Sequence, residues 1–184
     1  FSVMLSRTGY TGELGYEIYA DGNSIRGIWT SLLETEKEII PAGLGCRDTL
    51  RMEMKYVLYG NDINEKTNPI EAGLGWITKT SKTSFIGKEK LLELQLSHTK
   101  KLICFEMIDR GIPRLGYSVT DGSIVVGSVT SGTQSPSLKK GIGLAYVDKK
   151  YSKAGTQLSI DVRGKQLKCE IVKAPFYKKG SVFS

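Results

Sequence analysis

The side chains that most often carry out chemistry are few in this sequence and far apart. His98 is the only histidine, and we find no Ser–His–Asp arrangement, no paired-histidine metal site and no G-x-x-x-x-G-K-[ST] phosphate loop. Gly9-Tyr-Thr-Gly12 is too short and wrongly placed for a dinucleotide-binding fingerprint. We therefore expect no metal site, and residue types and spacing alone define no catalytic constellation.

The three cysteines, Cys46, Cys104 and Cys169, are odd in number and widely separated. This spacing argues against a disulfide framework and against a zinc or iron–sulfur centre. We interpret all three as reduced, buried side chains of an intracellular protein. No apolar run approaches the roughly 18 residues of a membrane span, so we expect no membrane partner.

The elements that would position any site differ between the two parts of the chain. In the first part, strand-like segments 1–6 and 16–19 flank a glycine-rich loop, which predicts a hairpin. Asn23 is a candidate cap for a helix whose apolar residues recur at helical spacing, with Trp29 in the core. We expect further helices over 47–55 and 87–96, and a buried strand within 70–79. This mixture is typical of an α+β fold.

The second part reads as short strands separated by turns such as Asp121-Gly122 and Arg163-Gly164. Six strands and no convincing helix favour a small antiparallel β-barrel or a sandwich. We place the domain boundary so that 1–96 and 97–184 are separate units. The six strand candidates are 101–107, 117–119, 124–129, 141–147, 157–162 and 165–172.

Charge is also divided unevenly along the chain. Residues 1–95 carry 11 Lys+Arg against 13 Asp+Glu, a net charge of −2, whereas residues 96–184 carry 15 against 6, a net charge of +9. A basic module suggests an acidic partner, which is nucleic acid, an anionic substrate tail or an acidic protein. The basic residues form scattered doublets without an aromatic stacking motif, so we do not expect nucleic acid.

Several longer strings resemble the glycine cleavage system T-protein (aminomethyltransferase) family, in one order and over essentially the whole chain. The strings are Ser6-Arg-Thr-Gly-Tyr-Thr-Gly-Glu-Leu-Gly-Tyr-Glu-Ile18, Ala42-Gly-Leu-Gly-Cys-Arg-Asp-Thr-Leu-Arg-Met-Glu53, Leu58-Tyr-Gly-Asn-Asp-Ile63, Pro69-Ile-Glu-Ala-Gly-Leu-Gly-Trp76, Phe85-Ile-Gly-Lys88, Gly127-Ser-Val-Thr-Ser-Gly-Thr-Gln-Ser-Pro-Ser-Leu138 and Ala174-Pro-Phe176. The chain is therefore identified as the C-terminal half of a member of this family.

The resemblance implies the end of a folate-binding α+β body followed by a C-terminal β-barrel. The implied activity moves the methylene carbon of an aminomethyl group from the lipoyl arm of the H-protein to tetrahydrofolate and releases ammonia. The family's catalytic aspartate would lie upstream of this chain, so we expect the fragment alone to be inactive. The implied location is a bacterial cytoplasm, or the mitochondrial matrix if the source is eukaryotic.

The resemblance also assigns folate-binding residues. Glu17 matches the family's folate-binding glutamate, and a carboxylate suits the adjacent N3–H and 2-amino donors of a pterin. Arg47 matches an arginine that faces the ligand, and Tyr10 matches a tyrosine of the folate pocket. Trp76 would be a further wall of this pocket. Lys101 stands where the family has an arginine, and would offer a point charge to a glutamyl carboxylate.

Two other functions remain open. The segment could belong to a sarcosine- or dimethylglycine-demethylating enzyme, which carries similar folate-binding sequence and would show a flavin-binding fingerprint upstream. It could also be a non-catalytic module that binds folate or a protein. The iron–sulfur assembly relatives of the same superfamily are disfavoured, because nothing here resembles their K-G-C-Y-x-G-Q-E string.

Overall fold

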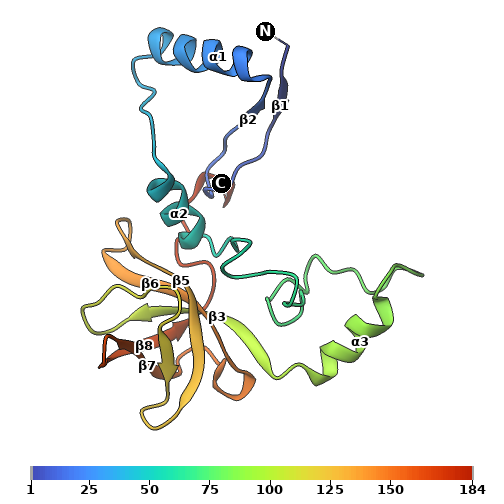
Figure 1. Cartoon of the computed structure of the whole chain (residues 1–184), viewed down its shortest axis with the longest axis vertical. Helices are drawn as coiled ribbons and strands as arrows, with labels where there is room; N and C mark the ends of the chain where they lie inside the picture. The colour runs from blue at the N-terminus through green and yellow to red at the C-terminus, as the bar shows by residue number, and fades with distance from the viewer. Residues whose placement is uncertain (1, 184) are drawn as a thin grey trace.

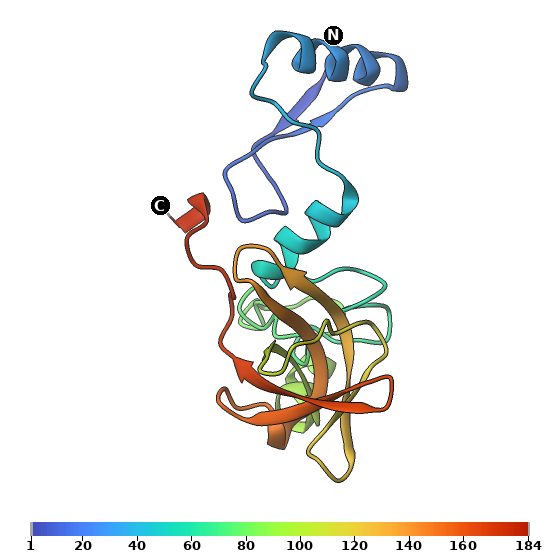
Figure 2. The same cartoon turned by 90° about the vertical axis from the view of Figure 1, so that its left-hand side faces the viewer.

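The computed structural model describes residues 2–183 and confirms an α+β segment followed by a closed six-stranded barrel (Figures 1 and 2). A hairpin with one helix lies at one end, and the barrel lies at the other. The described elements are β1 (Met4–Ser6), β2 (Glu17–Tyr19), α1 (Gly22–Thr35), α2 (Leu44–Glu53), α3 (Lys88–Ser97), β3 (Lys100–Met107), β4 (Ser118–Thr120), β5 (Val125–Ser135), β6 (Lys140–Asp148), β7 (Gln157–Val162) and β8 (Lys165–Val172), with short 3-10 turns at Lys149–Tyr151 and Ser181–Phe183.

The predicted hairpin is present, and Leu5 of β1 pairs with Ile18 of β2 in antiparallel register. The helix that follows is capped by Asp21 and not by Asn23, because the Asp21 carboxylate accepts backbone N–H bonds of 3.0 and 3.1 Å from Asn23 and Ser24. The helix therefore begins at Gly22, two residues earlier than an Asn23 cap would place it.

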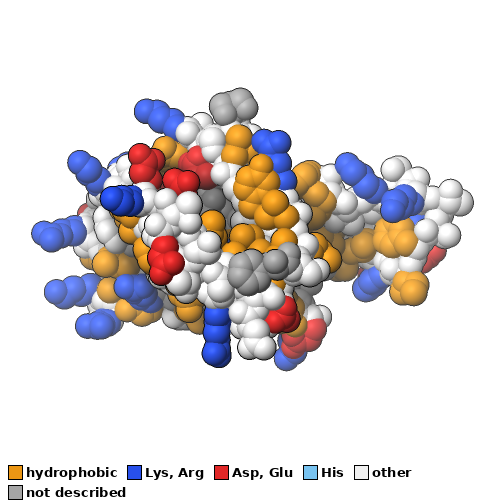
Figure 3. Space-filling model, turned by 90° about the horizontal axis from the view of Figure 1, so that it is seen from above, with side chains coloured by type: hydrophobic (Ala, Val, Ile, Leu, Met, Phe, Trp, Pro, Cys, Tyr) orange, Lys and Arg blue, Asp and Glu red, His pale blue; other side chains and the backbone are white. Residues whose placement is uncertain are grey.

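The expectation that Trp29 lies in the core is wrong for residues 2–183. Trp29 is 55% exposed, and α1 buries no residue. Figure 3 looks down on this end of the molecule and shows hydrophobic side chains gathered there. The apolar stripe of α1 is real, but no described part of the chain packs over it. The exposed hydrophobic side chains of β1, β2 and α1 are Met4, Leu5, Tyr19, Ile25, Trp29 and Leu32.

The predicted buried strand within residues 70–79 is also wrong, since this stretch is a series of turns. The side chain of Asn68 accepts the backbone N–H bonds of Ile70 and Glu71 at 3.0 and 2.9 Å, which bends the chain where a strand would have to extend. Of the apolar run, Ala72 is buried, whereas Trp76 is 73% exposed. The run therefore lines a surface hollow and is not a core strand.

The barrel closes in the order β3-β6-β5-β4-β7-β8, with every neighbouring pair antiparallel. Alternate side chains of β3 separate its two faces. Ile103, Phe105 and Met107 pack inside the barrel, whereas Leu102 and Cys104 face outward and are buried as well. Both faces are buried because the outer surface of β3 and β6 packs against the end of α2.

That outer cluster joins the two parts of the chain. Met52 of α2 packs with Leu144 of β6 and with Phe176 beyond β8. The cysteines divide between environments: Cys104 and Cys169 are buried, as expected, but Cys46 is exposed on α2, so its predicted burial is wrong. Burial raises the pKa of the Cys104 and Cys169 thiols to about 12, so both stay protonated at neutral pH.

Candidate functional site

Tyr10 is held between the glycine-rich loop and the chain that leaves α2. Its hydroxyl donates a 2.5 Å hydrogen bond to the carbonyl oxygen of Val57, and its ring stacks on that of Tyr56 with centroids 5.7 Å apart. Burial raises the pKa of the Tyr10 hydroxyl, so it remains a donor at neutral pH. The ring is therefore fixed in place before any ligand arrives.

Arg47 covers one face of that ring. Its guanidinium carbon lies 4.9 Å from the Tyr10 centroid, within the range of a cation–π interaction. Arg47 is on the exposed side of α2, so its remaining donors face solvent. The structure thus brings together two residues that are far apart in the sequence and that we had singled out separately.

A cavity of about 420 Å³ lies beside this pair, within the range of small-molecule sites. Tyr10, Tyr56 and Trp76 contribute its aromatic walls, and Lys55 contributes a cation. A flat, polar ring of the size of a fused bicycle matches such walls. Tyr10 and Trp76, both predicted site residues, therefore share one cavity, although their roles in binding stay predictions.

Glu17 stands apart from the residues that line this cavity. It begins β2, and its carboxylate accepts hydrogen bonds from the hydroxyl of Thr8 and, at 3.3 Å, from that of Tyr19. Thr8 and Gly9 line a smaller hollow of about 130 Å³, and Gly9 also borders the larger cavity. Glu17 is thus connected to the site through the glycine-rich loop.

Lys101 is the fifth predicted residue, and it lines a different cavity of about 410 Å³ beside the start of β3 and the end of β8. This second cavity shares one residue with the first, since Lys55 lines both. The structure therefore places Lys101 next to the aromatic cavity and not inside it.

Two contacts position the glycine-rich loop. Gly12 has a φ of +81°, and a Cβ there would overlap the Met54 side chain, so only glycine fits. On the other side the C-terminal residues bind the loop: the backbone N–H of Ser181 donates to the Glu13 carboxylate at 2.8 Å, and the N–H of Leu14 donates to the Ser181 hydroxyl at 2.8 Å. The loop that carries Tyr10 is therefore held by the end of α2 and by the C-terminal residues.

Comparison with known proteins identifies the architecture around this site. The GCVT N-terminal domain matches residues 1–82, and the glycine cleavage T-protein C-terminal barrel domain matches residues 100–178. The chain belongs to the glycine cleavage T-protein family. Residues 83–99 lie between the two segments that match T-protein domains, and they contain α3.

Curated T-protein relatives are similar over nearly all of this chain. The aminomethyltransferase of Bacteroides thetaiotaomicron is 51% identical over 96% of the chain, and that of Halothermothrix orenii is 50% identical over 95%. The crystal structure of glycine cleavage system aminomethyltransferase T from Bartonella henselae superposes with a TM-score of 0.89 at 31% identity, covering 96% of this chain and 50% of that one. The chain spans about half the length of the curated relatives it matches.

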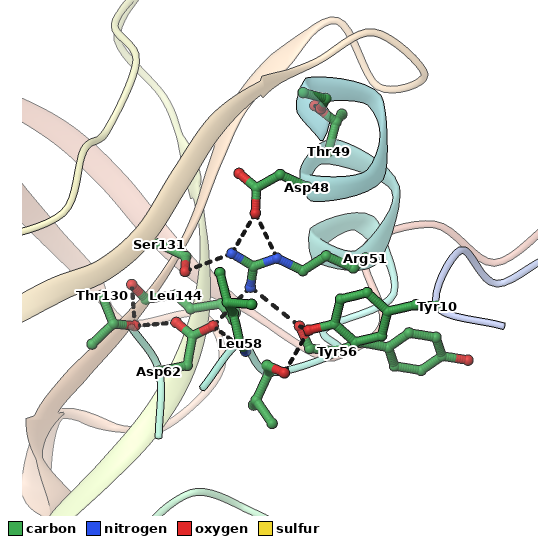
Figure 4. A network of polar contacts seen from close by, with 12 residues as sticks. Tyr10, Asp48, Thr49, Arg51, Tyr56, Leu58, Asp62, Thr130, Ser131 and Leu144 are labelled. Atoms are coloured by element: carbon green, nitrogen blue, oxygen red, sulfur yellow. Dashed lines mark hydrogen bonds and ion pairs between the residues drawn. The ribbon is translucent and has the colours of Figure 1, made fainter. Parts of the chain in front are cut away.

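Three of the T-protein strings together form a buried polar network that sequence reasoning missed (Figure 4). Arg51 of α2 donates to the Asp62 carboxylate at 2.7 Å and to the Ser131 hydroxyl at 2.8 Å, and Thr130 donates to Asp62 at 2.5 Å. Arg51 also forms an ion pair with Asp48, at 2.7 Å. These bonds fasten α2 and the turn after it to strand β5 of the barrel.

A second set of bonds ties the end of α2 to the same region of the barrel. The buried Glu53 carboxylate accepts hydrogen bonds from the hydroxyls of Ser135, at 2.5 Å, and Ser137, at 2.9 Å. The serine-rich string 127–138 therefore helps to hold α2 on the barrel. The sequence shows that the serines and Glu53 belong to strings that resemble the family, but it does not show which of them form hydrogen bonds with one another.

Residues 2–183 show neither a metal-binding cluster nor a membrane-spanning helix. No group of three or more His, Cys, Asp or Glu side chains is arranged to hold a metal ion. Every described helix is too short or too polar to cross a lipid bilayer.

Proposed function

We propose that this chain supplies the folate-binding C-terminal half of an aminomethyltransferase of the glycine cleavage system. The reaction breaks the carbon–sulfur bond of the aminomethyl group on the lipoyl arm of the H-protein, restores the thiol, releases ammonia and leaves a methylene bridge on tetrahydrofolate. The observation that carries the proposal is the cavity walled by Tyr10 and Trp76, with Arg47 over the Tyr10 ring, in a chain of this family.

The chemistry of the cavity supports a reduced folate as its ligand. Aromatic walls provide apolar area and ring faces for a pterin or an aminobenzoyl group. Arg47 keeps free donors next to them, and an always-charged planar fork suits carbonyl and carboxylate groups. Glycines at 9 and 12 let the backbone of the loop approach a flat ligand closely.

Glu17 has the chemistry to recognise the pterin edge. A carboxylate offers two acceptor oxygens to the side-by-side N3–H and 2-amino donors of a pterin. One Glu17 oxygen accepts the bonds of Thr8 and Tyr19, so the side chain is already oriented. We propose that Glu17 reaches the pterin across the glycine-rich loop that links it to the Tyr10 cavity.

The exposed apolar side chains of β1, β2 and α1 form a surface on which another part of the fold could pack. The curated relatives are about twice as long, and the apolar side chains of α1 and the hairpin are exposed within residues 2–183. We propose that the N-terminal half of the aminomethyltransferase fold covers this surface and brings the catalytic aspartate. On this proposal 1–96 completes the folate-binding body, and the basic unit 97–184 meets the H-protein. The bacterial relatives support a bacterial cytoplasm as its location.

The direct test is reconstitution. This chain is joined to the N-terminal half of the Bacteroides thetaiotaomicron relative, and ammonia release is measured with aminomethyl-loaded H-protein, with and without tetrahydrofolate. We expect folate-dependent ammonia release with one methylene-tetrahydrofolate formed for each ammonia. A properly folded fusion that binds H-protein but forms no methylene-tetrahydrofolate would refute the proposal.

A further inference from the structure

The chain beyond β8 leaves the barrel and returns to the glycine-rich loop between β1 and β2. The backbone N–H of Tyr177 donates to the carbonyl oxygen of Glu53 at 2.9 Å, and that of Val182 donates to the carbonyl oxygen of Gly12 at 3.3 Å. Residues 177–183, which we call the strap, therefore run from the end of α2 to the loop, and Figure 1 shows the red strap beside the blue loop.

The strap is bound to the loop through Glu13 and Ser181. The Glu13 carboxylate accepts the backbone N–H of Ser181 at 2.8 Å and its hydroxyl at 2.5 Å, and the Ser181 hydroxyl oxygen accepts the N–H of Leu14 at 2.8 Å. The hydroxyl and N–H bonds from Ser181 lower the pKa of Glu13, so its carboxylate is charged at neutral pH. A charged acceptor makes these bonds stronger than bonds between neutral groups.

Gly180 lets the strap lie directly against the loop. A Cβ on Gly180 would lie 2.4 Å from the carbonyl oxygen of Gly12, so a larger residue does not fit at this contact. Gly12 also lies against the Met54 side chain at the end of α2. The loop is therefore held by α2 and by the strap at the same residue.

The strap reaches the neighbours of two residues that we propose to bind folate. Val182 lines the 130 Å³ hollow together with Thr8 and Tyr56. Thr8 donates a hydrogen bond to the Glu17 carboxylate, and the ring of Tyr56 stacks on that of Tyr10. The strap therefore borders the same hollow as the side chains that orient Glu17 and Tyr10.

We propose that the strap acts as a clasp on the glycine-rich loop, and that Glu13 and Ser181 are positioning residues for the ligand of the Tyr10 cavity. The clasp fixes the loop in the arrangement that presents Tyr10 and Glu17 together. Without it, a loop with glycines at 9, 12 and 15 samples many conformations, and the apparent affinity falls with the fraction of molecules whose loop is correctly placed. The identity of the ligand rests on the proposed function, whereas the clasp is a property of the chain itself.

Amide hydrogen exchange of the fusion described above, without ligand, tests the clasp itself. Ser181→Asp places a carboxylate against that of Glu13, so the amides of residues 9–15 should exchange faster, while those of β3 and β6 keep their protection. Ser181→Ala should give a smaller increase, largest at Leu14, whose N–H loses its acceptor. Ser97→Ala is the control, because Ser97 is exposed and its hydroxyl bonds within α3. Unchanged exchange of the loop in Ser181→Asp would overturn the proposal.

Calorimetric titration of the same proteins with 5-formyltetrahydrofolate tests the effect on binding. Ser181→Asp should weaken binding about tenfold, which corresponds to a loop that is correctly placed about a tenth of the time. Adding Glu13→Gln should restore most of this loss, because the new amide can donate to the new carboxylate. The urea midpoint of Ser181→Asp should stay close to that of Ser97→Ala, since exposed substitutions change stability little. An affinity loss matched by a loss of stability, or no recovery with Glu13→Gln, would contradict the positioning role.

The two measurements separate failure of the clasp from failure of the proposed function. Faster exchange of the loop in Ser181→Asp, in a fusion that binds no folate, would support the clasp and refute the folate assignment. Folate binding that is equally tight in the unaltered fusion and in Ser181→Asp would support the folate assignment and overturn the positioning role.

Discussion

The guanidinium of Arg51 and the carboxylate of Asp62 lie 2.7 Å apart and are 1% and 0% exposed. The same guanidinium donates to the carbonyl oxygen of Tyr56 at 3.2 Å, next to the Val57 carbonyl that accepts the Tyr10 hydroxyl. The buried pair therefore fixes the segment on which the aromatic cavity is built. The Arg51–Asp62 ion pair therefore contributes both to the stability of the fold and to the position of the Tyr10 ring in the cavity.

Breaking this pair is expected to cost about 3 kcal/mol of unfolding free energy, because Asp62→Asn leaves the half-exposed Asp48 carboxylate as the remaining countercharge of the buried Arg51 guanidinium. Urea denaturation measures the change. The exposed pair Lys90–Glu93 gives the control, and Glu93→Gln should cost no more than about 0.5 kcal/mol. Equal effects of the two substitutions would contradict the role given to Asp62.

Gly12→Ala should destabilise the protein by about 1–3 kcal/mol, since the new methyl group combines left-handed strain with overlap of Met54. Gly60→Ala separates the two causes, because Gly60 has φ +91° but open space around its Cβ position. Thermal or urea unfolding should show the smaller loss at Gly60. A larger loss at Gly60 would mean that the Met54 contact does not constrain the loop.

Tyr10→Phe should remove about 1 kcal/mol of stability, because the Val57 carbonyl loses its donor while the ring stays in the cavity. Folate affinity should fall further in Tyr10→Ala, which also removes the surface under Arg47. Urea denaturation and calorimetry measure the two effects. Equal folate affinities of the Tyr10→Phe and Tyr10→Ala variants would show that the Tyr10 ring does not contact the ligand.

Asp121 should stay ionised down to low pH. The backbone N–H of Ile124 and the hydroxyl of Tyr151 donate to it and lower its pKa to about 2. Because the folded pKa is depressed, the stabilisation is present above the unfolded pKa of about 4 and is lost as pH falls toward 2. Carboxyl NMR titration should show the pKa rising in Tyr151→Phe and unchanged in Tyr16→Phe, an exposed tyrosine remote in sequence. An unshifted pKa in Tyr151→Phe would exclude the bond.

The barrel followed from the sequence because its signals are local. β7 and β8 have the predicted limits, Gln157–Val162 and Lys165–Val172, since alternating residues and the Arg163-Gly164 turn specify them without reference to distant segments. The strand predicted for the apolar run after Asn68 was wrong because the local sequence does not specify its structure. A short apolar run does not by itself separate a buried strand from turns that line a hollow, and the Asn68 side-chain bonds decide between them here.

Parts of the candidate site could not be predicted because they depend on tertiary contacts. Nothing near Lys55 in the sequence signals its positive φ, +58°, or its place between two cavities. The Arg51–Asp62 pair joins residues whose partners, Thr130 and Ser131, lie far along the chain. Trp29 failed differently: its helical periodicity was correct, but a periodic stripe does not say which surface covers it.

The most direct test of the central claim is a calorimetric titration of 5-formyltetrahydrofolate into the fusion with the Bacteroides thetaiotaomicron N-terminal half. Glu17→Gln should weaken binding about tenfold to a hundredfold, the loss of a charge-assisted pair of hydrogen bonds. Trp76→Ala should also weaken it, whereas Glu34→Gln, an exposed change on α1, should leave it unchanged. No saturable binding to the folded fusion, or equal affinity in all four proteins, would contradict the folate site.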